Sequence, residues 1–404
     1  MSETEKDAIG HSGPSGNSIA PIVVQKYGGS SVATTDKIMA VARRIEESVK
    51  SGKRVCVVVS AMANTTDELL EKAGEISQAP PRRELDMLLS CGERAAMALL
   101  SMAVSELGLE AISFTGSQCG IMTNDRHWGA RIVEVRPFRV LDELERGRVV
   151  IVAGFQGVSY KREITTLGRG GSDTTAVALA AALSAEYCEI CSDVDGVFTA
   201  DPRVVSAASL LDSISHDEMT ELATHGARVL HPQAIEFAKR SGIKLWARGT
   251  SSDARGTRID RPDEASAGSI GVAGQKGLFH LSFASSETAA VLSVLSSAGV
   301  EVASLSQTET GGSLMVDRDD APEWATVVAS LPTSVEIREA GAVSVVGAGL
   351  GARAEALARA LEVAESESVS VIQMAASPLR LTLSCDRTDV DKLCAALHRE
   401  FVEG

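Results

Sequence analysis

The chain has 404 residues, of which 44% are hydrophobic, 23% are charged and only 3% are aromatic. This composition can build a large aliphatic core in two or three domains, and it excludes a disordered or fibrous chain. The 54 acidic residues outnumber the 39 lysines and arginines, so the formal net charge is −15. A surface this negative repels phosphate backbones and anionic lipids, so we expect no nucleic-acid or membrane partner.

The cysteine content and the apolar segments indicate a cytoplasmic protein. Seven cysteines spread over 404 residues do not form the paired framework of a small secreted protein. No uninterrupted run approaches the ~20 apolar residues of a membrane helix. Residues 1–21 lack the apolar centre of a signal peptide, and we expect them to form a disordered tail outside the fold.

From residue 22 to about residue 250, short aliphatic runs alternate with amphipathic segments. The aliphatic runs predict strands of a parallel sheet, and the segments of helical period predict helices. Alternation of this kind indicates an α/β domain over residues 22–250, with a mostly parallel sheet sandwiched by helices. We expect strands at residues 22–25, 55–60, 149–153, 187–191 and 243–247, and helices at 35–50, 67–76, 84–107 and 176–182.

The composition changes at residues 251–268, which are rich in Gly, Ser and Asp, and we expect a linker there. Beyond it, two short units share the β-α-β-β-α-β order of small regulatory modules. We therefore expect two small α+β units over residues 269–404. Their strands are predicted at residues 278–284, 300–305, 314–316, 343–346, 369–374 and 379–385, and their helices at 287–298, 355–364 and 390–401.

A glycine-rich turn joins the first predicted strand to the first helix. Gly28 and Gly29 allow the backbone to approach a ligand closely, and the helix that follows presents free N–H groups. Lys26 could reach phosphates held at this turn. The lysine precedes the glycines, so the turn is not a P-loop. An ordinary strand–helix turn with a solvated lysine is the alternative on these residues alone.

Two further polar segments have the residue types of an anion-binding site. In residues 168–175, backbone amides and the guanidinium of Arg169 would form a receptor for a carboxylate or a phosphate. In residues 192–203, Asp193 could hydrogen-bond a ribose and Arg203 could meet a phosphate. The alternatives are a glycine-rich loop with a surface arginine in the first case and an ordinary Asp-Gly turn in the second.

Glu93 lies at the edge of an apolar stripe on a predicted helix, so its carboxylate needs a cation to stay charged. That cation could be Arg94, another arginine of the domain or the ammonium group of an amino-acid substrate. Farther along the chain, we favour Arg228 over His231 for contact with a nucleotide. A lone histidine before proline is more often a structural hydrogen-bonding residue.

Together these segments resemble the aspartate kinases of the amino-acid kinase family. The matching motifs are residues 26–31, 154–157, 166–176 and 192–203, in the family's order, and the likeness extends from about residue 22 to residue 249. The resemblance implies transfer of the ATP γ-phosphoryl group to the β-carboxylate of L-aspartate, giving 4-phospho-L-aspartate. The sequence shows no dense carboxylate cage, so Mg²⁺ would be held mainly by ATP oxygens, and we expect no metal site.

The resemblance also implies roles for individual residues. Lys26, Arg169 and Asp173 would be catalytic. Phe198 and Arg228 replace a tyrosine and a lysine that are common among relatives, but they retain a ring and a cation. Aspartate would be bound by Thr66, Glu93, Arg169, Gly170, Gly171 and Ser172, and the nucleotide by Lys26, Tyr27, Gly28, Gly29, Ser192, Asp193, Phe198, Arg203 and Arg228.

Residues 269–404 resemble, more loosely, the paired ACT regulatory domains of aspartate kinases. This resemblance implies a homodimer formed through the region and control by lysine, threonine or both. The turn at residues 283–288, however, lacks the glycine and proline that shape the effector site of regulated relatives, and alanine stands at residue 303 in place of an aspartate. Without those polar partners an effector's charges would be desolvated and unpaired, so we expect weak feedback control.

Two other functions are compatible with parts of the sequence. One is a kinase of the same fold that acts on another small carboxylate, and the other is a non-catalytic amino-acid sensor. The presence of Lys26, Glu93, Arg169 and Asp173 argues against the sensor, because a silent relative would be free to lose them. As an aspartate kinase, the chain would supply an acyl phosphate for aspartate-family amino acids or for a specialised aspartate-derived product.

Overall fold

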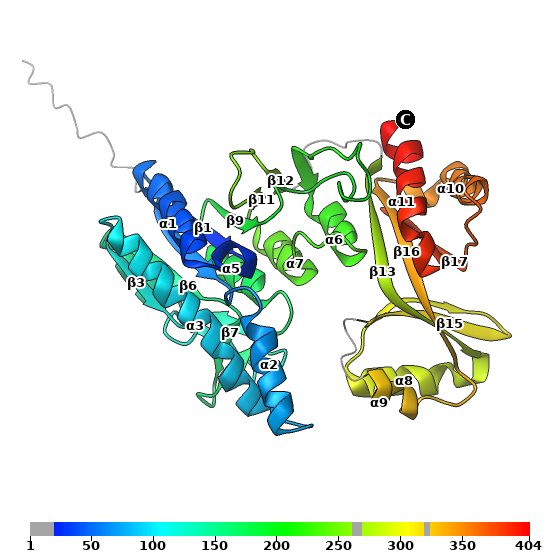
Figure 1. The fold of residues 1–404 in the computed structure, drawn as a ribbon, viewed down its shortest axis with the longest axis horizontal. Coiled ribbons are helices and arrows are strands. Elements are labelled where there is room, and N and C mark those ends of the chain that lie inside the picture. Colours follow the sequence, from blue (N-terminus) through cyan, green and yellow to red (C-terminus); the bar gives the residue numbers. More distant parts are fainter. Residues whose placement is uncertain (1–19, 261–268, 319–323) are drawn as a thin grey trace, which may run out of the picture.

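The computed structural model describes residues 20–260, 269–318 and 324–404. An eight-stranded sheet with helices on both faces forms the N-terminal domain, and a six-stranded sheet with its own helices forms the C-terminal region (Figure 1). Of the predicted tail, residues 1–19 lie outside the described residues. Ala20 and Pro21 belong to the fold, since the carbonyl groups of both accept hydrogen bonds from Arg54.

The eight-stranded sheet has the order β10-β12-β11-β9-β1-β2-β6-β3. Six of its strands are parallel, and β10 and β12 run antiparallel to them. A mostly parallel sheet was predicted, and the structure confirms it. The strands are β1 (Ile22–Tyr27), β2 (Arg54–Val59), β3 (Ala111–Phe114), β6 (Val149–Ala153), β9 (Tyr187–Ser192), β10 (Ser213–Ser215), β11 (Leu245–Gly249) and β12 (Thr257–Asp260).

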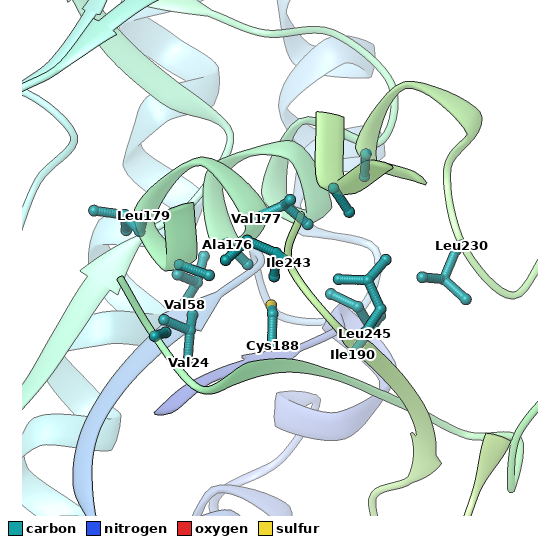
Figure 2. Close-up of a cluster of buried hydrophobic side chains, with 14 of the residues drawn as sticks. Val24, Val58, Ala176, Val177, Leu179, Cys188, Ile190, Leu230, Ile243 and Leu245 are labelled. Carbon is teal, nitrogen blue, oxygen red and sulfur yellow. The ribbon is translucent and has the colours of Figure 1, made fainter. Parts of the chain in front are cut away.

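Both faces of this sheet are covered, which explains why its strands read as continuous apolar runs. On one face, helices α1 (Thr35–Lys50) and α3 (Arg82–Glu106) pack against side chains such as Val23 and Val57. On the other, α5 (Gly171–Ala182) lies over Val24 and Val58 (Figure 2). The second face is completed by α4 (Phe138–Glu145), α6 (His216–Thr224) and α7 (Pro232–Ser241).

A small four-stranded sheet lies beside α3 and supports the loop that leads into α5. Asp86 of α3 is fully buried, and it accepts hydrogen bonds from the Thr166 hydroxyl at 2.5 Å and from the backbone N–H of Trp128 at 3.2 Å. These bonds tie the helix to the end of strand β8. The order of the sheet is β5-β4-β7-β8, with β4 (Ile121–Thr123), β5 (Ile132–Val135), β7 (Gln156–Ser159) and β8 (Ile164–Thr166); helix α2 (Thr65–Ile76) packs nearby on α3.

Helix α3 is long and apolar enough, by length and composition alone, to cross a membrane. Its sequence contains no long uninterrupted apolar run, because glycine, serine and charged residues interrupt it, so the sequence did not predict a membrane helix here. Half of its most apolar segment is buried inside the protein, against α1 and the strands β3 and β6. This burial is typical of a core helix.

The C-terminal region is one continuous antiparallel sheet with the order β14-β15-β13-β16-β18-β17. The long strands β13 (Ser269–Ala284) and β16 (Glu336–Gly347) pass through both halves, so the two predicted α+β units share them (Figure 1). The other elements are β14 (Val302–Gln307), β15 (Gly311–Asp317), β17 (Gln373–Ser377), β18 (Arg380–Cys385), α8 (Thr288–Ala298), α9 (Trp324–Ser330), α10 (Ala354–Ser366) and α11 (Val390–His398).

Several elements were not predicted, namely β3, β4, β5, β7, β8, β10, α4, α6, α7 and α9. Two predicted segments also have other bounds or another structure. Residues 257–260 of the predicted linker form β12, which pairs with β11 and extends the central sheet, whereas residues 261–268 lie outside the described residues. The strand predicted at residues 369–374 begins only at Gln373, because the buried side chain of Val369 packs in the core before the strand pairing starts. The apolar residues of this segment therefore predicted that it is buried, but they did not predict where its strand pairing begins.

Candidate active site

The centre of the candidate site is an ion pair between Lys26, near the end of β1, and Asp173, in the first turn of α5. The Lys26 Nζ atom lies 2.7 Å from Asp173 Oδ1, and only about a tenth of each side chain is exposed. The other carboxylate oxygen accepts a hydrogen bond from the backbone N–H of His231 at 3.3 Å. The pair therefore joins three segments that are far apart in the sequence at the carboxyl edge of the sheet.

The turn after Lys26 makes close backbone contacts on two sides, and one of them requires glycine at position 29. The Gly28 N–H donates to the carbonyl of Cys191 at 3.2 Å, which fixes the turn to β9. A Cβ atom on Gly29 would lie 2.7 Å from the carbonyl oxygen of Ala61, nearer than real Cβ atoms come. The turn thus stays in close contact with its neighbours on two sides, and any larger residue at position 29 would displace it.

The start of α5 depends on glycine for a different reason. Gly170 has a φ of +68°, and a Cβ atom there would lie 2.0 Å from the ring of His231. In the motif of residues 154–157, a Cβ atom on Gly154 would lie 2.7 Å from the hydroxyl oxygen of Ser172. The His231 ring therefore packs under the loop, where burial lowers its pKa, and its backbone holds Asp173. The expected hydrogen-bonding role is carried by the backbone of His231 and not by its ring, whose buried Nδ1 has no hydrogen-bond partner.

Glu93 is buried on α3 with one of its carboxylate oxygens unsatisfied. Its Oε1 atom accepts a hydrogen bond from the Ala61 N–H at 3.1 Å, whereas Oε2 is buried and has no hydrogen-bond partner. Burial raises the pKa of Glu93 to about 7, although two backbone hydrogen bonds partly oppose the effect. The neighbouring Arg94 donates instead to Gln156 at 3.2 Å. Of the cations considered from the sequence, the ammonium of a bound amino acid fits the buried oxygen better than Arg94.

On the nucleotide side, Ser192 and Asp193 line a polar cavity of about 310 Å³. Ser31 and Thr250 close one wall through a hydrogen bond of 2.6 Å between their hydroxyl groups. The backbone N–H of Thr250 also donates to the carbonyl of Ser192 at 2.7 Å. Phe198 is half-buried and pairs with Leu210 in a short bridge. This cavity adjoins the glycine turn through Ser30 and Ser31.

The prediction for Tyr27 needs correction, because its side chain is wholly buried. It faces the core under α1 and α3, where its hydroxyl donates to Gln25 Oε1 at 3.3 Å and burial raises its pKa. Successive residues of a strand point to opposite faces, so Tyr27 turns away from the side that Lys26 occupies. Only the backbone of Tyr27 could touch a nucleotide.

The predicted arginines lie at the surface of the site. Arg203 binds the carboxylate of Asp201 through two guanidinium nitrogens, at 2.9 and 2.7 Å, and its side chain is 88% exposed. Arg169 and Arg228 are also exposed. Thr66 is half-buried in the first turn of α2. Arg203 would have to share or exchange its carboxylate partner to bind a phosphate.

The structure also reveals a buried polar cluster that the sequence analysis missed. Glu189 of β9 is 3% exposed, accepts a hydrogen bond from Gln25 at 2.9 Å and forms an ion pair with Arg248 at 2.7 Å. Arg44 donates to the carbonyl of Gly249 beside it, at the wall of the polar cavity. A glutamate in the middle of an otherwise apolar strand is a signal that could have revealed this cluster.

The described residues contain no group of three or more histidine, cysteine, aspartate or glutamate side chains that could hold a metal ion. Two of the carboxylates near the site are bound to cationic side chains. Asp173 pairs with Lys26, and Asp201 pairs with Arg203. A divalent cation at this site would therefore need most of its oxygen ligands from a substrate.

Comparison with known proteins identifies the family. Residues 21–247 match the sequence model of the Amino acid kinase family. The chain is 41% identical to an aspartokinase of Mycolicibacterium smegmatis over 94% of this chain and 96% of that protein. It is 42% identical to an aspartokinase of Corynebacterium glutamicum over 95% and 96% of the two chains. The chain belongs to the aspartokinase family.

Solved structures of the aspartokinase family share this architecture. The crystal structure of Escherichia coli aspartokinase III in complex with aspartate and ADP superposes with a TM-score of 0.80 and 27% identity. The match covers 93% of this chain and 99% of the other. The complex of the same enzyme with lysine and aspartate has a TM-score of 0.77. These likenesses confirm the predicted family and fold class, and membership of the aspartokinase family makes this chain a nucleotide-using kinase.

Proposed function

We propose that this chain is an aspartate kinase, which transfers the γ-phosphoryl group of ATP to the β-carboxylate of L-aspartate and releases 4-phospho-L-aspartate and ADP. The observation that carries the proposal is the pair of Lys26 and Asp173, 2.7 Å apart, between a glycine turn and the first turn of a helix. A cation held beside a glycine turn and the first turn of a helix is what a transferring, multiply charged phosphoryl group requires.

The reaction needs alignment rather than a general base. A carboxylate with a reference pKa of about 3.9 is ionised at neutral pH, so it can attack without losing a proton. A bond forms between the β-carboxylate oxygen and the γ-phosphorus, while the bond from that phosphorus to the β,γ-bridging oxygen breaks and its electron pair leaves with ADP. Lys26 would stabilise the charge on the transferring group, and Asp173 and the His231 N–H would keep Lys26 in place.

The aspartate would lie between α3 and the loop before α5. The unsatisfied oxygen of Glu93 is a partner for its ammonium group, and Arg169 is a partner for a carboxylate. The other proposed ligands of aspartate are Thr66, Gly170, Gly171 and Ser172.

The nucleotide would lie along the carboxyl ends of β1 and β9. Gly28 and Gly29 would approach the phosphates, and Ser192 and Asp193 line the cavity in which the remainder could be held. Lys26, the Tyr27 backbone, Phe198, Arg203 and Arg228 are the other proposed contacts. Mg²⁺ would enter as part of the MgATP substrate, because the donor set of the site offers a metal ion few free carboxylates.

A hydroxamate assay tests the proposal directly. The purified chain, ATP and Mg²⁺ are incubated with hydroxylamine and with aspartate, glutamate or no amino acid, and the trapped acyl hydroxamate is measured. We expect product with aspartate and little with glutamate, whose longer side chain would place its carboxylate out of line with the phosphoryl group. Faster turnover of glutamate would favour the kinase of another carboxylate, and no product with any carboxylate would favour the amino-acid sensor.

We also propose a cytoplasmic homodimer that associates through the C-terminal sheet. All seven cysteines are free, which is typical of a reducing compartment. The outer strands β14 and β17 each have one edge without a strand partner among the described residues, and such edges can pair with a second chain. Light scattering of the purified chain would show twice the mass of one chain if the dimer forms.

A further inference from the structure

The loop that follows Asp193 is built into the core of the C-terminal region. Residues 197–211 fold back on themselves, with the Thr199 N–H donating to Ser209 and the Leu211 N–H donating to Val197, both at 2.9 Å. Between these bonds, Ala200 and Val205 are buried in the hydrophobic cluster of α11 and β13. The proposed nucleotide contacts at positions 198 and 203 therefore stand on a loop that is anchored partly outside the catalytic domain, through Ala200 and Val205.

A buried hydrogen bond fixes this loop to the last helix of the chain. The Thr199 hydroxyl lies 2.9 Å from Nε2 of His398, and these residues are 5% and 1% exposed. His398 Nδ1 lies 3.0 Å from a carboxylate oxygen of Glu403, which can only accept when ionised. Nδ1 therefore carries the proton in the neutral ring, and Nε2 accepts from Thr199. The same Thr199 oxygen accepts a hydrogen bond from the Ser209 N–H at 3.0 Å, so the hydroxyl both donates and accepts.

Strand β13 holds the same residue from the other side. The backbone N–H of Val272 donates to the carbonyl of Thr199 at 2.7 Å. A Cβ atom on Gly271 would lie 2.9 Å from that carbonyl, so glycine is needed for the strand to come this near. Thr199 is thus held through its side chain by α11 and through its backbone by β13. Figure 1 shows these two elements side by side at the junction with the N-terminal domain.

The second predicted nucleotide loop, which contains Arg228, rests on the same sheet. Gly226 has a φ of +124°, and a Cβ atom there would lie 2.4 Å from the carbonyl of Gly274 in β13. The preceding His225 contacts the guanidinium of Arg380 in β18. The contacts of Lys26, Asp173 and Glu93 given above, by contrast, all lie within the catalytic domain. Two of the proposed nucleotide loops are therefore supported by the C-terminal region, whereas the Lys26–Asp173 pair and Glu93 are supported within the catalytic domain.

We propose that His398 is a positioning residue for the nucleotide, which acts through Thr199 to hold the loop of residues 192–203 in its binding conformation. This inference rests on the proposed function of that loop. It assigns to α11 a role in nucleotide affinity that is separate from aspartate binding. Because Thr199 and Phe198 are neighbours in an extended pairing, fixing the side chain of one also fixes the direction in which the other points.

Two pairs of variants test the inference in the full-length chain. Thr199→Val keeps the shape of the side chain but removes the hydroxyl, and Thr199→Ser retains the hydroxyl as the matched control. His398→Ala removes the ring, whereas His398→Gln keeps an amide that can reach Thr199. Losing this bond leaves a buried polar atom unpaired, so we expect Thr199→Val and His398→Ala to raise the KM for ATP about tenfold. The KM for aspartate should change less than about twofold, and Thr199→Ser and His398→Gln should restore much of the ATP affinity.

His280→Ala controls for the loss of any buried histidine from this region. His280 is 5% exposed on β13, where it contacts Arg338 and not the nucleotide loops. The His280→Ala variant should have a lower melting temperature than the wild type, but unchanged KM values for ATP and for aspartate. An equal rise in both KM values for Thr199→Val and His398→Ala, no rise for ATP, or the same rise in His280→Ala would overturn the proposal.

Calorimetric titration with ADP separates this inference from the proposed function. ADP binding needs no phosphoryl acceptor, so it can be measured even if aspartate is not the substrate. We expect the Kd for ADP to rise about tenfold in Thr199→Val and to return toward the wild-type value in Thr199→Ser. Unchanged ADP binding in Thr199→Val would refute the positioning role, whereas weakened ADP binding with no aspartate kinase activity in the wild type would refute only the proposed reaction.

Discussion

Glu93 should make aspartate binding strongly dependent on pH in a range where free carboxylates do not titrate. Burial raises its pKa to about 7, and only the ionised form can pair with the ammonium group of a substrate. Below that value the apparent KM for aspartate should therefore rise about tenfold for each pH unit, so that at pH 6 it is roughly tenfold above its limit at high pH. Above pH 7 the curve should level off.

The assay measures initial rates between pH 5.5 and 7.5 at saturating MgATP, so that titration of the nucleotide does not enter the KM for aspartate. Glu93→Gln is the matched variant, since glutamine keeps an acceptor for the Ala61 N–H. We expect it to raise the KM for aspartate by about 10²-fold or more at pH 7.5, because the ammonium loses its charged partner, and to remove the pH dependence. A wild-type KM that does not change between pH 6 and 7.5, or a variant that keeps the wild-type profile, would refute the reasoning.

The same carboxyl group should lower the stability of the ligand-free protein. A pKa raised from 4.5 to about 7 corresponds, at about 1.36 kcal/mol per pH unit, to roughly 3 kcal/mol. The folded chain binds this proton more tightly than the unfolded chain does. The loss of stability caused by ionising the buried Glu93 is therefore absent below about pH 4.5. It grows as the pH rises to about 7 and is constant above that pH. At pH 8 Glu93→Gln should melt several degrees above the wild type, and below about pH 4.5 the two should melt together.

Lys26→Ala should lower kcat by at least ~10²-fold in a chain with an unchanged circular dichroism spectrum, because one preorganised donor to the transferring group is lost; a folded variant with near-normal turnover would remove Lys26 from the mechanism. Arg169→Ala should raise the KM for aspartate far more than that for ATP, and Arg203→Ala should do the reverse; equal effects on both substrates would mean that these contacts are misassigned. Lysine and threonine, titrated separately and together to several millimolar at subsaturating aspartate, should inhibit weakly, since the polar groups at residues 283–288 already bond to Gln307; strong inhibition would reveal an effector site elsewhere.

The sequence predicted the elements whose patterns are long and regular. Helix α1 begins and ends at the predicted residues, and β6 does so as well, because a strong apolar period or an unbroken aliphatic run leaves few alternatives. Strand β12 was missed because its four residues follow a stretch rich in serine and glycine, and its pairing with β11 is decided by contacts far along the chain. Strands this short carry little local signal.

The candidate site was predicted as a set of residues, but not as an arrangement. Glycine motifs at the ends of strands located Lys26 and Asp173, yet only the structure gives the ion pair between them. Tyr27 was included with Lys26 although adjacent strand residues face opposite sides, so the period of two could have excluded its side chain. The pKa of Glu93 depends on the number of apolar atoms around it and on a missing hydrogen bond, and neither can be derived from one sequence.

The shared strands β13 and β16 have a consequence for how the protein is made. During synthesis, residues 269–275 leave the ribosome long before residues 342–347, their partners in the sheet, have been added to the chain. Until residues 342–347 are made, the first half of β13 has an apolar face, and its backbone N–H and C=O groups have no strand partner on the side that β16 will occupy. Each half of the C-terminal sheet needs a strand from the other, so neither half is complete until β16 has been made. A chain released early would expose an aggregation-prone edge, and a nascent chain of this protein is expected to depend on chaperones during that interval.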